Sequence, residues 1–152
     1  MILKVATAED LDILFADLRP MDIDTLERLG GLVRAREIVD LLMVNFPHQL
    51  FVTEEGKPVA LWIALRKWDG CFELFGYTGN EAEKNKVGFY KACMRGCEYI
   101  RDILGAHKIE CIVWGNYDRS IRWLKRLGFE KEGYCRQHGP DKSDATIMGR
   151  VM

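Results

Sequence analysis

The sequence predicts one mixed α/β domain over residues 1–152, built on a central, mixed but mostly antiparallel sheet. Three observations indicate this class. The chain is long enough to bury one core and too short for two ordinary domains. Apolar segments between residues 49 and 78 are joined by short turns at Glu55-Gly56 and Asp69-Gly70, which is typical of antiparallel hairpins. A strand, helix, strand order follows over residues 107–137 and adds a crossover to the hairpins.

The N-terminal part is predicted to be one short strand, residues 2–6, followed by helices. Thr7, with Asp10 three residues later, forms a helix start that is similar to a capping box. The apolar stripe of this helix runs to Leu18, and Pro20 is expected to stop it. The remaining helical stretches are residues 22–29 and 34–45.

The rest of the chain alternates strands and helices. The three hairpin strands are residues 49–55, 58–68 and 71–78. A long helix follows Gly79-Asn80 and ends at Gly105. Its apolar residues recur every three or four positions, which predicts one buried face: Phe89, Cys93, Cys97, Ile100 and Leu104. The last predicted elements are a strand (107–114), a helix (117–127) and two strands (129–137 and 144–152).

The composition excludes several classes of protein. Hydrophobic residues make up 48% and charged residues 30%, which describes a globular chain rather than a disordered or fibrous one. No apolar run approaches the roughly 18 residues of a membrane span, and the N-terminus does not resemble a secretory signal. We therefore expect a cytoplasmic protein with no membrane partner.

The five cysteines are expected to be reduced thiols, because an odd number without a signal peptide argues against a disulfide framework. Cys93 and Cys97 share a helix face, and His107 lies close to Cys111 in the sequence. Zinc ligands usually sit at tight turns, whereas these residues lie in apolar helix and strand patterns. We expect buried small side chains and no metal.

The net charge of −1 conceals two oppositely charged halves. Residues 1–83 contain eight Lys and Arg against 15 Asp and Glu, whereas residues 84–152 contain 14 against eight. The simpler interpretation is two surfaces that attract each other. The alternative is a basic half that meets an anion and an acidic half that meets a cation.

Two segments resemble a known family. Residues 113–134, VWGNYDRSIRWLKRLGFEKEGY, place Asn116 and Ser120 ahead of Leu127-Gly128-Phe129, and residues 73–90 run from Glu73 through FGYTGNEAEKNKVGFY. With the order of elements, they resemble the GCN5-related N-acetyltransferase (GNAT) family over nearly the whole chain. The resemblance implies helices on both faces of the sheet and fourth and fifth strands that splay apart.

The resemblance implies acetyl-coenzyme A as the cofactor. A helix N-terminus reached through a glycine-containing loop offers backbone N–H groups to a pyrophosphate, although lysines at such a helix start are also ordinary solvated residues. The pantetheine arm is implied to pair with the fourth strand and with the Asn116 amide, for which a helix N-cap is the alternative role. The implied cofactor-binding residues are Phe75, Gly76, Tyr77, Thr78, Lys84, Lys86, Val87, Gly88, Phe89, Asn116 and Ser120.

The implied reaction is attack of an amine on the thioester carbonyl, which needs a base, an N–H donor to the developing oxyanion and an acid. Glu73 is the predicted base, with a solvent-facing strand glutamate as the alternative. The backbone N–H of Tyr77 is the predicted oxyanion donor. The acceptor is expected to be a protein lysine, an N-terminus or a small amine, because the segment Glu9–Glu27 has seven acids and one base.

Three positions depart from the family pattern. Asn85 stands at the first position of the phosphate signature, where the family has a long Arg or Gln side chain. Tyr90 stands where a small residue normally lets the pyrophosphate approach, so it is predicted to obstruct that site. Leu124 stands at the position of the family's acid tyrosine, and leucine cannot donate a proton. Tyr117 is the predicted replacement acid, with Cys71 as the other option.

Further hypotheses stay open. Residues 114–129 also resemble the end of GNAT-like proteins of short-tailed bacteriophages, which suggests a catalytically silent protein acting in the virion or on a host protein. Its location would then be the virion or the host cytoplasm. A homodimer is compatible with each reading. Nucleic-acid binding is disfavoured because the whole chain is slightly acidic, although one predicted helix contains Arg119, Arg122, Lys125 and Arg126.

Overall fold

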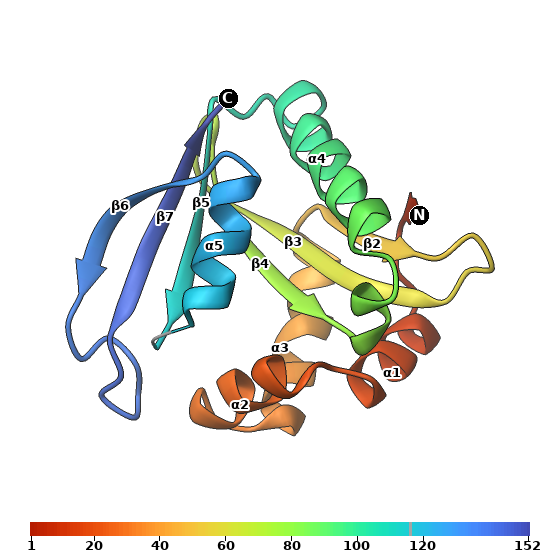
Figure 1. Cartoon of the computed structure of the whole chain (residues 1–152), viewed down its shortest axis with the longest axis horizontal. Helices are drawn as coiled ribbons and strands as arrows, with labels where there is room; N and C mark the ends of the chain where they lie inside the picture. Colours follow the sequence, from red (N-terminus) through yellow and green to blue (C-terminus); the bar gives the residue numbers. More distant parts are fainter. Residues whose placement is uncertain (116) are drawn as a thin grey trace.

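The computed structural model describes residues 1–115 and 117–152, so the predicted cofactor residue Asn116 lies outside the described residues. Figure 1 shows a curved sheet with helices on either side of it. The elements in chain order are β1 (Ile2–Lys4), α1 (Ala8–Ala16), α2 (Pro20–Arg28), α3 (Leu32–Asn45), β2 (His48–Val52), β3 (Pro58–Trp68), β4 (Cys71–Thr78), the short 3-10 helix η1 (Asn80–Glu83), α4 (Lys86–Asp102), β5 (Lys108–Trp114), α5 (Asp118–Arg126), β6 (Glu130–Cys135) and β7 (Ala145–Val151).

The strands form one sheet in the order β1-β2-β3-β4-β5-β7-β6. Neighbouring strands are antiparallel throughout, except β4 and β5, which run parallel. The parallel pair arises because α4 crosses over the sheet between β4 and β5. The predicted mixed, mostly antiparallel sheet is confirmed.

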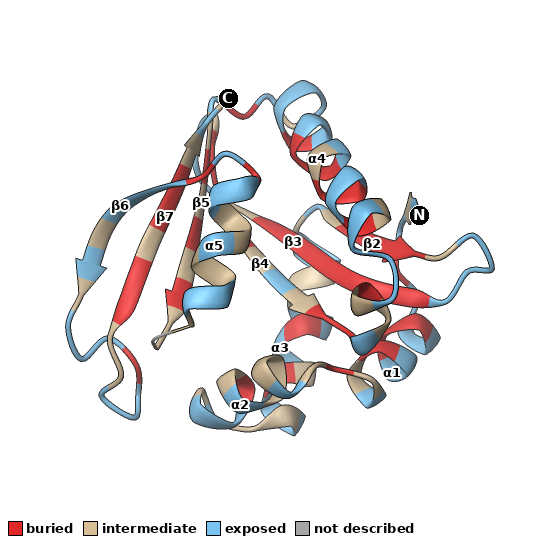
Figure 2. Ribbon diagram, viewed as in Figure 1, coloured by how far each residue is buried: buried red, intermediate tan, exposed pale blue. Residues whose placement is uncertain are grey.

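The helices cover both faces of the sheet, and each face has its own core. On one face, Leu14 of α1 and Val39 of α3 pack in a cluster with Ile63 of β3. On the other face, the apolar side of α4 packs with Trp62 and Phe129, and α5 adds partly buried side chains. Figure 2 shows the buried residues along the central strands and on the inner side of α4. The predicted buried face of α4 is confirmed from Phe89 to Ile100.

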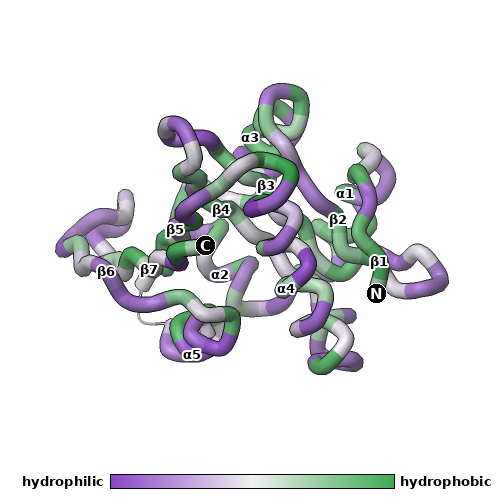
Figure 3. Tube along the Cα trace, turned by 90° about the horizontal axis from the view of Figure 1, so that it is seen from above, coloured by the Kyte–Doolittle hydropathy of each residue, from purple (hydrophilic) through white to green (hydrophobic). Residues whose placement is uncertain are grey.

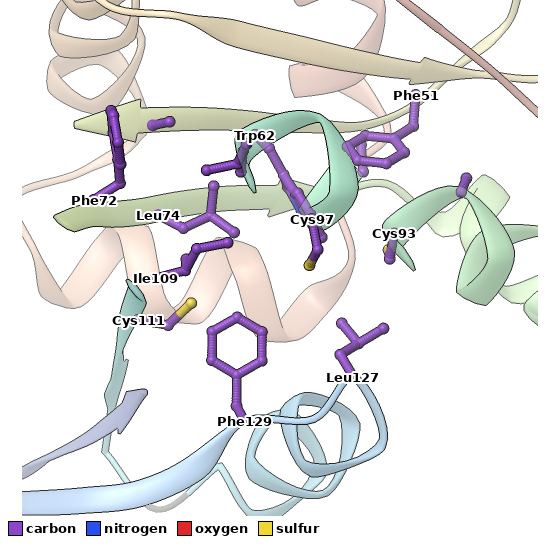
Figure 4. Packing of buried hydrophobic residues seen from close by; sticks show 14 of the residues in the cluster. Phe51, Trp62, Phe72, Leu74, Cys93, Cys97, Ile109, Cys111, Leu127 and Phe129 are labelled. Atoms are coloured by element: carbon purple, nitrogen blue, oxygen red, sulfur yellow. The ribbon is translucent and has the colours of Figure 1, made fainter. Parts of the chain in front are cut away.

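The Leu127-Gly128-Phe129 junction turns the chain from α5 into β6. Gly128 has φ 85°, a left-handed conformation that glycine adopts most easily. The Gly128 N–H donates to the Lys125 carbonyl (3.0 Å) and the Phe129 N–H to the Leu124 carbonyl (3.0 Å), which closes the helix end. Phe129 is fully buried and lies among Leu127, Ile109 and Cys111 (Figure 4). This glycine and phenylalanine therefore have a structural role that needs no cofactor.

Several boundary predictions are wrong. The second strand ends at Val52 instead of residue 55, and the long helix starts at Lys86, after η1, and ends at Asp102.

Two further errors have local reasons. Pro20 begins α2 instead of ending α1, because the first helical position needs no N–H donor. The first strand ends at Lys4, since Thr7 already caps α1 in a capping box with Asp10. After α1, Leu18 makes an isolated bridge with Gly79 at the end of β4. The link between α1 and α2 is thus attached to the central sheet.

Four of the five cysteines are buried free thiols, as predicted, and Cys135 is half-buried. Burial raises the pKa of the Cys93 and Cys111 thiols, so both stay neutral. Within residues 1–115 and 117–152, no three His, Cys, Asp or Glu side chains are grouped so that they could hold a metal ion. No helix in this part of the chain is long and apolar enough to cross a membrane.

Candidate functional site

The site begins where β4 and β5 part. The two strands are paired only at Cys71–Lys108, Phe72–Ile109 and Glu73–Glu110. Beyond this point β4 continues beside β3 to Thr78, and β5 continues beside β7 to Trp114. The divergence opens a cleft of about 420 Å³, lined by residues of α2, β4, β5, α5 and the start of α4. The predicted splay of the fourth and fifth strands is confirmed.

The far end of the open edge of β4 is capped by the start of α2. The Thr78 N–H donates to Asp22 Oδ1 (3.0 Å), and the Arg19 N–H donates to the Thr78 carbonyl (3.0 Å). Between this cap and the paired residues near Glu73, β5 has diverged and pairs with β7 alone. Gly76 lies in the middle of this gap.

The direction of each backbone group along β4 follows from strand alternation. The Gly79 N–H donates to the Val59 carbonyl of β3 (2.8 Å), whereas Thr78 bonds away from β3. Because donors alternate along a strand, Tyr77 bonds toward β3 and Gly76 toward the cleft. The prediction that the Tyr77 N–H donates to an oxyanion is therefore wrong. The Gly76 N–H and carbonyl are the groups that face the cleft.

The structure brings most of the predicted site residues together. Those that line the cleft are Glu73, Phe75, Gly76, Tyr77, Thr78, Lys86, Phe89, Tyr117 and Ser120. The predicted cofactor residues Lys84, Val87 and Gly88 lie outside the lining. The cleft is thus built mainly by β4, α5, α2 and β5, and less by the loop before α4.

Among the carboxylates that line the cleft, Glu73 differs from the others. Asp22 pairs with Arg19 (2.9 Å), and burial raises the pKa of Asp22 despite this pairing. Glu83 pairs with Lys86 and Arg119. Glu73 is half-buried and has no ion pair or hydrogen bond with the described residues. A carboxylate with free oxygens in a cleft is what proton transfer requires.

The start of α4 offers less to an anion than predicted. The Asn85 side chain caps the helix by accepting the Gly88 N–H (2.8 Å). Lys84 pairs with Glu81 (2.9 Å) and Lys86 with Glu83 (3.3 Å), so nearby carboxylates offset both lysines. A ligand phosphate at this helix end would have to compete with these groups.

Tyr90 lies outside the cleft lining, and its predicted obstruction of a pyrophosphate stays a prediction. Its ring packs edge-on against Trp123 of α5, with centroids 6.2 Å apart, and its hydroxyl lies 3.5 Å from the Arg126 carbonyl. Tyr90 is not part of the cleft lining. The reason is that α5 offers an aromatic surface on this side, where Trp123 also stacks on Phe89 at 5.3 Å.

Two phenols, Tyr77 and Tyr117, line the cleft, whereas the predicted alternative acid Cys71 does not. Leu124 takes the position of the family acid and packs partly buried against the core. Cys71 is fully buried and does not line the cleft, which removes it as an acid. The Tyr117 hydroxyl donates to Asp24 of α2, and burial together with this contact raises the pKa of Tyr117. Burial also raises the pKa of Tyr77, so both phenols stay protonated at neutral pH.

Sequence reasoning missed the basic wall of the cleft. Arg119, Arg122 and Arg126 line it from α5, and Arg122 and Arg126 have no carboxylate partner among the described residues. Figure 3 shows α5 as a largely hydrophilic helix. The spacing of three and four residues predicts one helix face and could have identified the set. In the sequence, these arginines together with Lys125 suggest a nucleic-acid surface, and so they were not assigned to a cleft.

Coenzyme A fits this cleft on two counts. The free Gly76 backbone offers a donor and an acceptor to an amide-rich arm, in the manner of an added strand. The arginines of α5 face the same cleft and suit phosphate groups. The Gly88 N–H, which Asn85 already binds, does not contribute to this fit.

Known structures share this architecture. A mutant form of the spermidine N-acetyltransferase SpeG from Vibrio cholerae aligns over 99% of this chain and 95% of its own, with a TM-score of 0.75 and 14% identity. The ribosomal-protein-alanine N-acetyltransferase from Brucella melitensis covers 100% of both chains, with a TM-score of 0.73 and 21% identity. A GNAT-family acetyltransferase from Bacillus anthracis covers 98% and 93%, with a TM-score of 0.75 and 16% identity.

At the level of sequence, no protein-family model matches the chain, and no curated protein matches it significantly. At these identities, the structural likeness establishes the arrangement of helices and strands. From β1 to β7, the chain therefore has the fold of the GNAT acetyltransferases over nearly its whole length.

Proposed function

We propose that the chain is an N-acyltransferase that moves an acetyl group from acetyl-coenzyme A to a primary amine on a protein lysine, an N-terminus or a small molecule. The supporting observation is the open cleft between β4 and β5, in which neither the cleft-facing Gly76 N–H and carbonyl nor the Glu73 carboxylate is paired with another of the described residues. The shared fold supports the same reaction class by analogy.

The base and the acid of the reaction each have a residue in or beside the cleft. Acetyl-coenzyme A supplies the thioester carbon that the amine attacks. Glu73 accepts the amine proton as the C–N bond forms and the C–S bond breaks. Tyr117 holds a proton at its hydroxyl for the departing sulfur, with Asp24 orienting that hydroxyl. Gly76 positions the pantetheine arm, and Ser120 and Phe89 line the same path.

The carboxylates in and beside the cleft favour a cationic acceptor. Asp22 and Asp24 on α2 are paired with Arg19 and Arg28, whereas Glu73 on β4 has no ion pair with the described residues. An ammonium group is attracted to such a surface before it loses its proton. Relatives in fold are named as enzymes for spermidine and for a ribosomal-protein alanine, so a polyamine and an N-terminus are the first acceptors to try.

A second candidate is a GNAT-fold protein without turnover, which binds a protein partner, for example in a virion or in a host. Two observations favour it. Leu124 removes the family's acid, and Asn85 occupies an N–H at the start of α4. A homodimer is compatible with either candidate.

Titration calorimetry with acetyl-coenzyme A is the first experiment, followed by an assay of coenzyme A release with spermidine, a lysine peptide and a peptide with an N-terminal alanine. Binding with turnover on one of these amines supports the acyltransferase. Binding without turnover on any amine supports the silent protein. No heat of binding at millimolar cofactor overturns the acyltransferase proposal.

A further inference from the structure

Three cations from three separate elements converge on one carboxylate in the cleft. Glu83, the last residue of η1, accepts a hydrogen bond from the Arg119 guanidinium of α5. Its other oxygen lies 3.3 Å from Lys86 Nζ at the start of α4. Arg19 Nη1, at the start of α2, lies 4.0 Å from the first oxygen. All four residues line the cleft.

This arrangement is an anion site that is already filled by a side chain. Partial burial works against ionisation of Glu83, but Lys86 and Arg119 outweigh it and lower the pKa of the Glu83 carboxyl. Glu83 is therefore an anion at neutral pH, and its side chain is still 34% exposed. Such a carboxylate is held by charge and can rotate away.

Glu81, on the same short helix, shows that the arrangement is specific to one position. Glu81 pairs with Lys57 (2.5 Å) and Lys84 (2.9 Å), and it does not line the cleft. The two glutamates have the same chemistry and lie two residues apart. Of these two glutamates, Glu83 is the one whose cationic partners line the cleft.

We infer that Glu83 is an internal competitor, which occupies a phosphate position between Arg19, Lys86 and Arg119 and gives way to a diphosphate ligand. A phosphate oxygen accepts the same charge-assisted hydrogen bonds as a carboxylate oxygen, and a diphosphate brings more negative charge. The site differs from a helix N-terminus, because Asn85 already caps α4 at Gly88. The inference rests on the proposed function in that coenzyme A contains such a diphosphate.

Inorganic pyrophosphate is the probe, because it tests the anion site without the rest of the cofactor. Titration calorimetry at low salt compares the wild type with Glu83→Gln, which keeps the size of the side chain and removes its charge. We expect pyrophosphate to bind about tenfold more tightly to Glu83→Gln. Glu81→Gln is the matched control, and its affinity is expected to stay within about twofold of the wild type.

The outcomes separate a site from a general charge effect. An equal gain in Glu83→Gln and Glu81→Gln overturns the inference, because net charge alone then explains it. An unchanged or weaker affinity in Glu83→Gln also overturns it. A second variant leaves η1 unchanged. Arg119→Gln, on the exposed side of α5, is expected to weaken pyrophosphate binding in the presence of the native Glu83. Unchanged binding in Arg119→Gln contradicts the site.

The same samples distinguish this inference from the proposed function. Tighter pyrophosphate binding without any binding of acetyl-coenzyme A keeps the anion site and rejects the acyltransferase. Acetyl transfer with no difference between the two glutamate variants keeps the enzyme and rejects the competitor.

Discussion

Glu73 and Glu110 are neighbours in register on β4 and β5, and they have opposite surroundings. Glu110 is held by Lys67 of β3 at 2.5 Å and by Lys108 at 3.0 Å, whereas Glu73 has no such partner among the described residues. The pair marks the last point at which the two strands are joined. The Glu110 carboxylate is ion-paired where the two strands are still joined, and the Glu73 carboxylate lines the cleft that begins there.

The two ends of β4 differ in the same way. At its paired end, the charges continue from Lys108 to Glu132 of β6 at 2.7 Å, so β3, β5 and β6 are tied together. At its open end, the Gly76 N–H and carbonyl have no strand partner within residues 1–115 and 117–152. The paired end of β4 thus contributes stability, and its open end offers an edge for binding. Substitutions at the two ends are expected to separate these properties.

The largest effect is expected at the free glutamate. Glu73→Gln removes the proposed base, and turnover at saturating acetyl-coenzyme A and amine should fall by about 10²- to 10³-fold. The dissociation constant of the cofactor should not change. Glu110→Gln, its partner in register, is the control and should leave turnover intact. Equal turnover in Glu73→Gln and the wild type would refute the role of Glu73.

The next effect concerns the open edge. Gly76→Pro removes the N–H that faces the cleft and should weaken acetyl-coenzyme A binding about tenfold, as measured by calorimetry. Gly76→Ala is the control, because its Cβ meets the same Trp62 ring (3.2 Å) and its N–H remains. A similar loss in both variants would show that side-chain volume, and not the N–H, is responsible.

A smaller effect is expected from the proposed acid. Tyr117→Phe should lower turnover about tenfold, and Tyr77→Phe, the other phenol of the cleft, should change it less. The pKa of Tyr117 lies above its ordinary value of 10.0 because of burial and Asp24. The phenol therefore loses its proton only above pH 10, and wild-type turnover should decline only there. In Asp24→Asn this decline should move to lower pH; an unmoved profile would exclude Tyr117 as the acid.

The smallest effect is on stability at the paired end. Lys67 and Lys108 lower the pKa of Glu110 below its ordinary 4.5, so the ion pairs contribute stability above that pH and lose it as the pH falls. Glu110→Gln should reduce the free energy of unfolding by about 1 kcal/mol at pH 7 in urea titrations. The difference should vanish in acid. Glu130→Gln, an exposed residue of β6, should show little change at either pH.

Sequence patterns predicted the elements well, because each depends on neighbours along the chain. The buried face of α4 follows from the spacing between Phe89 and Ile100, and it is confirmed. The exceptions at element boundaries had local causes. Pro20 was predicted to end a helix, but it starts α2 because the first helical position needs no N–H donor.

The candidate site was predictable in part. The family resemblance predicted Glu73 and Gly76 as site residues, and both line the cleft, although the direction of the Tyr77 N–H required the register with β3. The sequence did not indicate the contact of Tyr90, whose ring packs against Trp123, a residue 33 positions later. The spacing of residues within one helix does not indicate which side chain from another element an aromatic ring will contact.

The sequence by itself determined the order of strands and helices, the mixed sheet and the buried faces, because periodicity and turn residues act over a few positions. Only the tertiary structure decided what the charges do. It brought Arg19, Lys86 and Arg119 to Glu83 from three elements, and it left Glu73 free beside a paired Glu110. Charge effects depend on distance in space, and the sequence does not give that distance until the chain has folded.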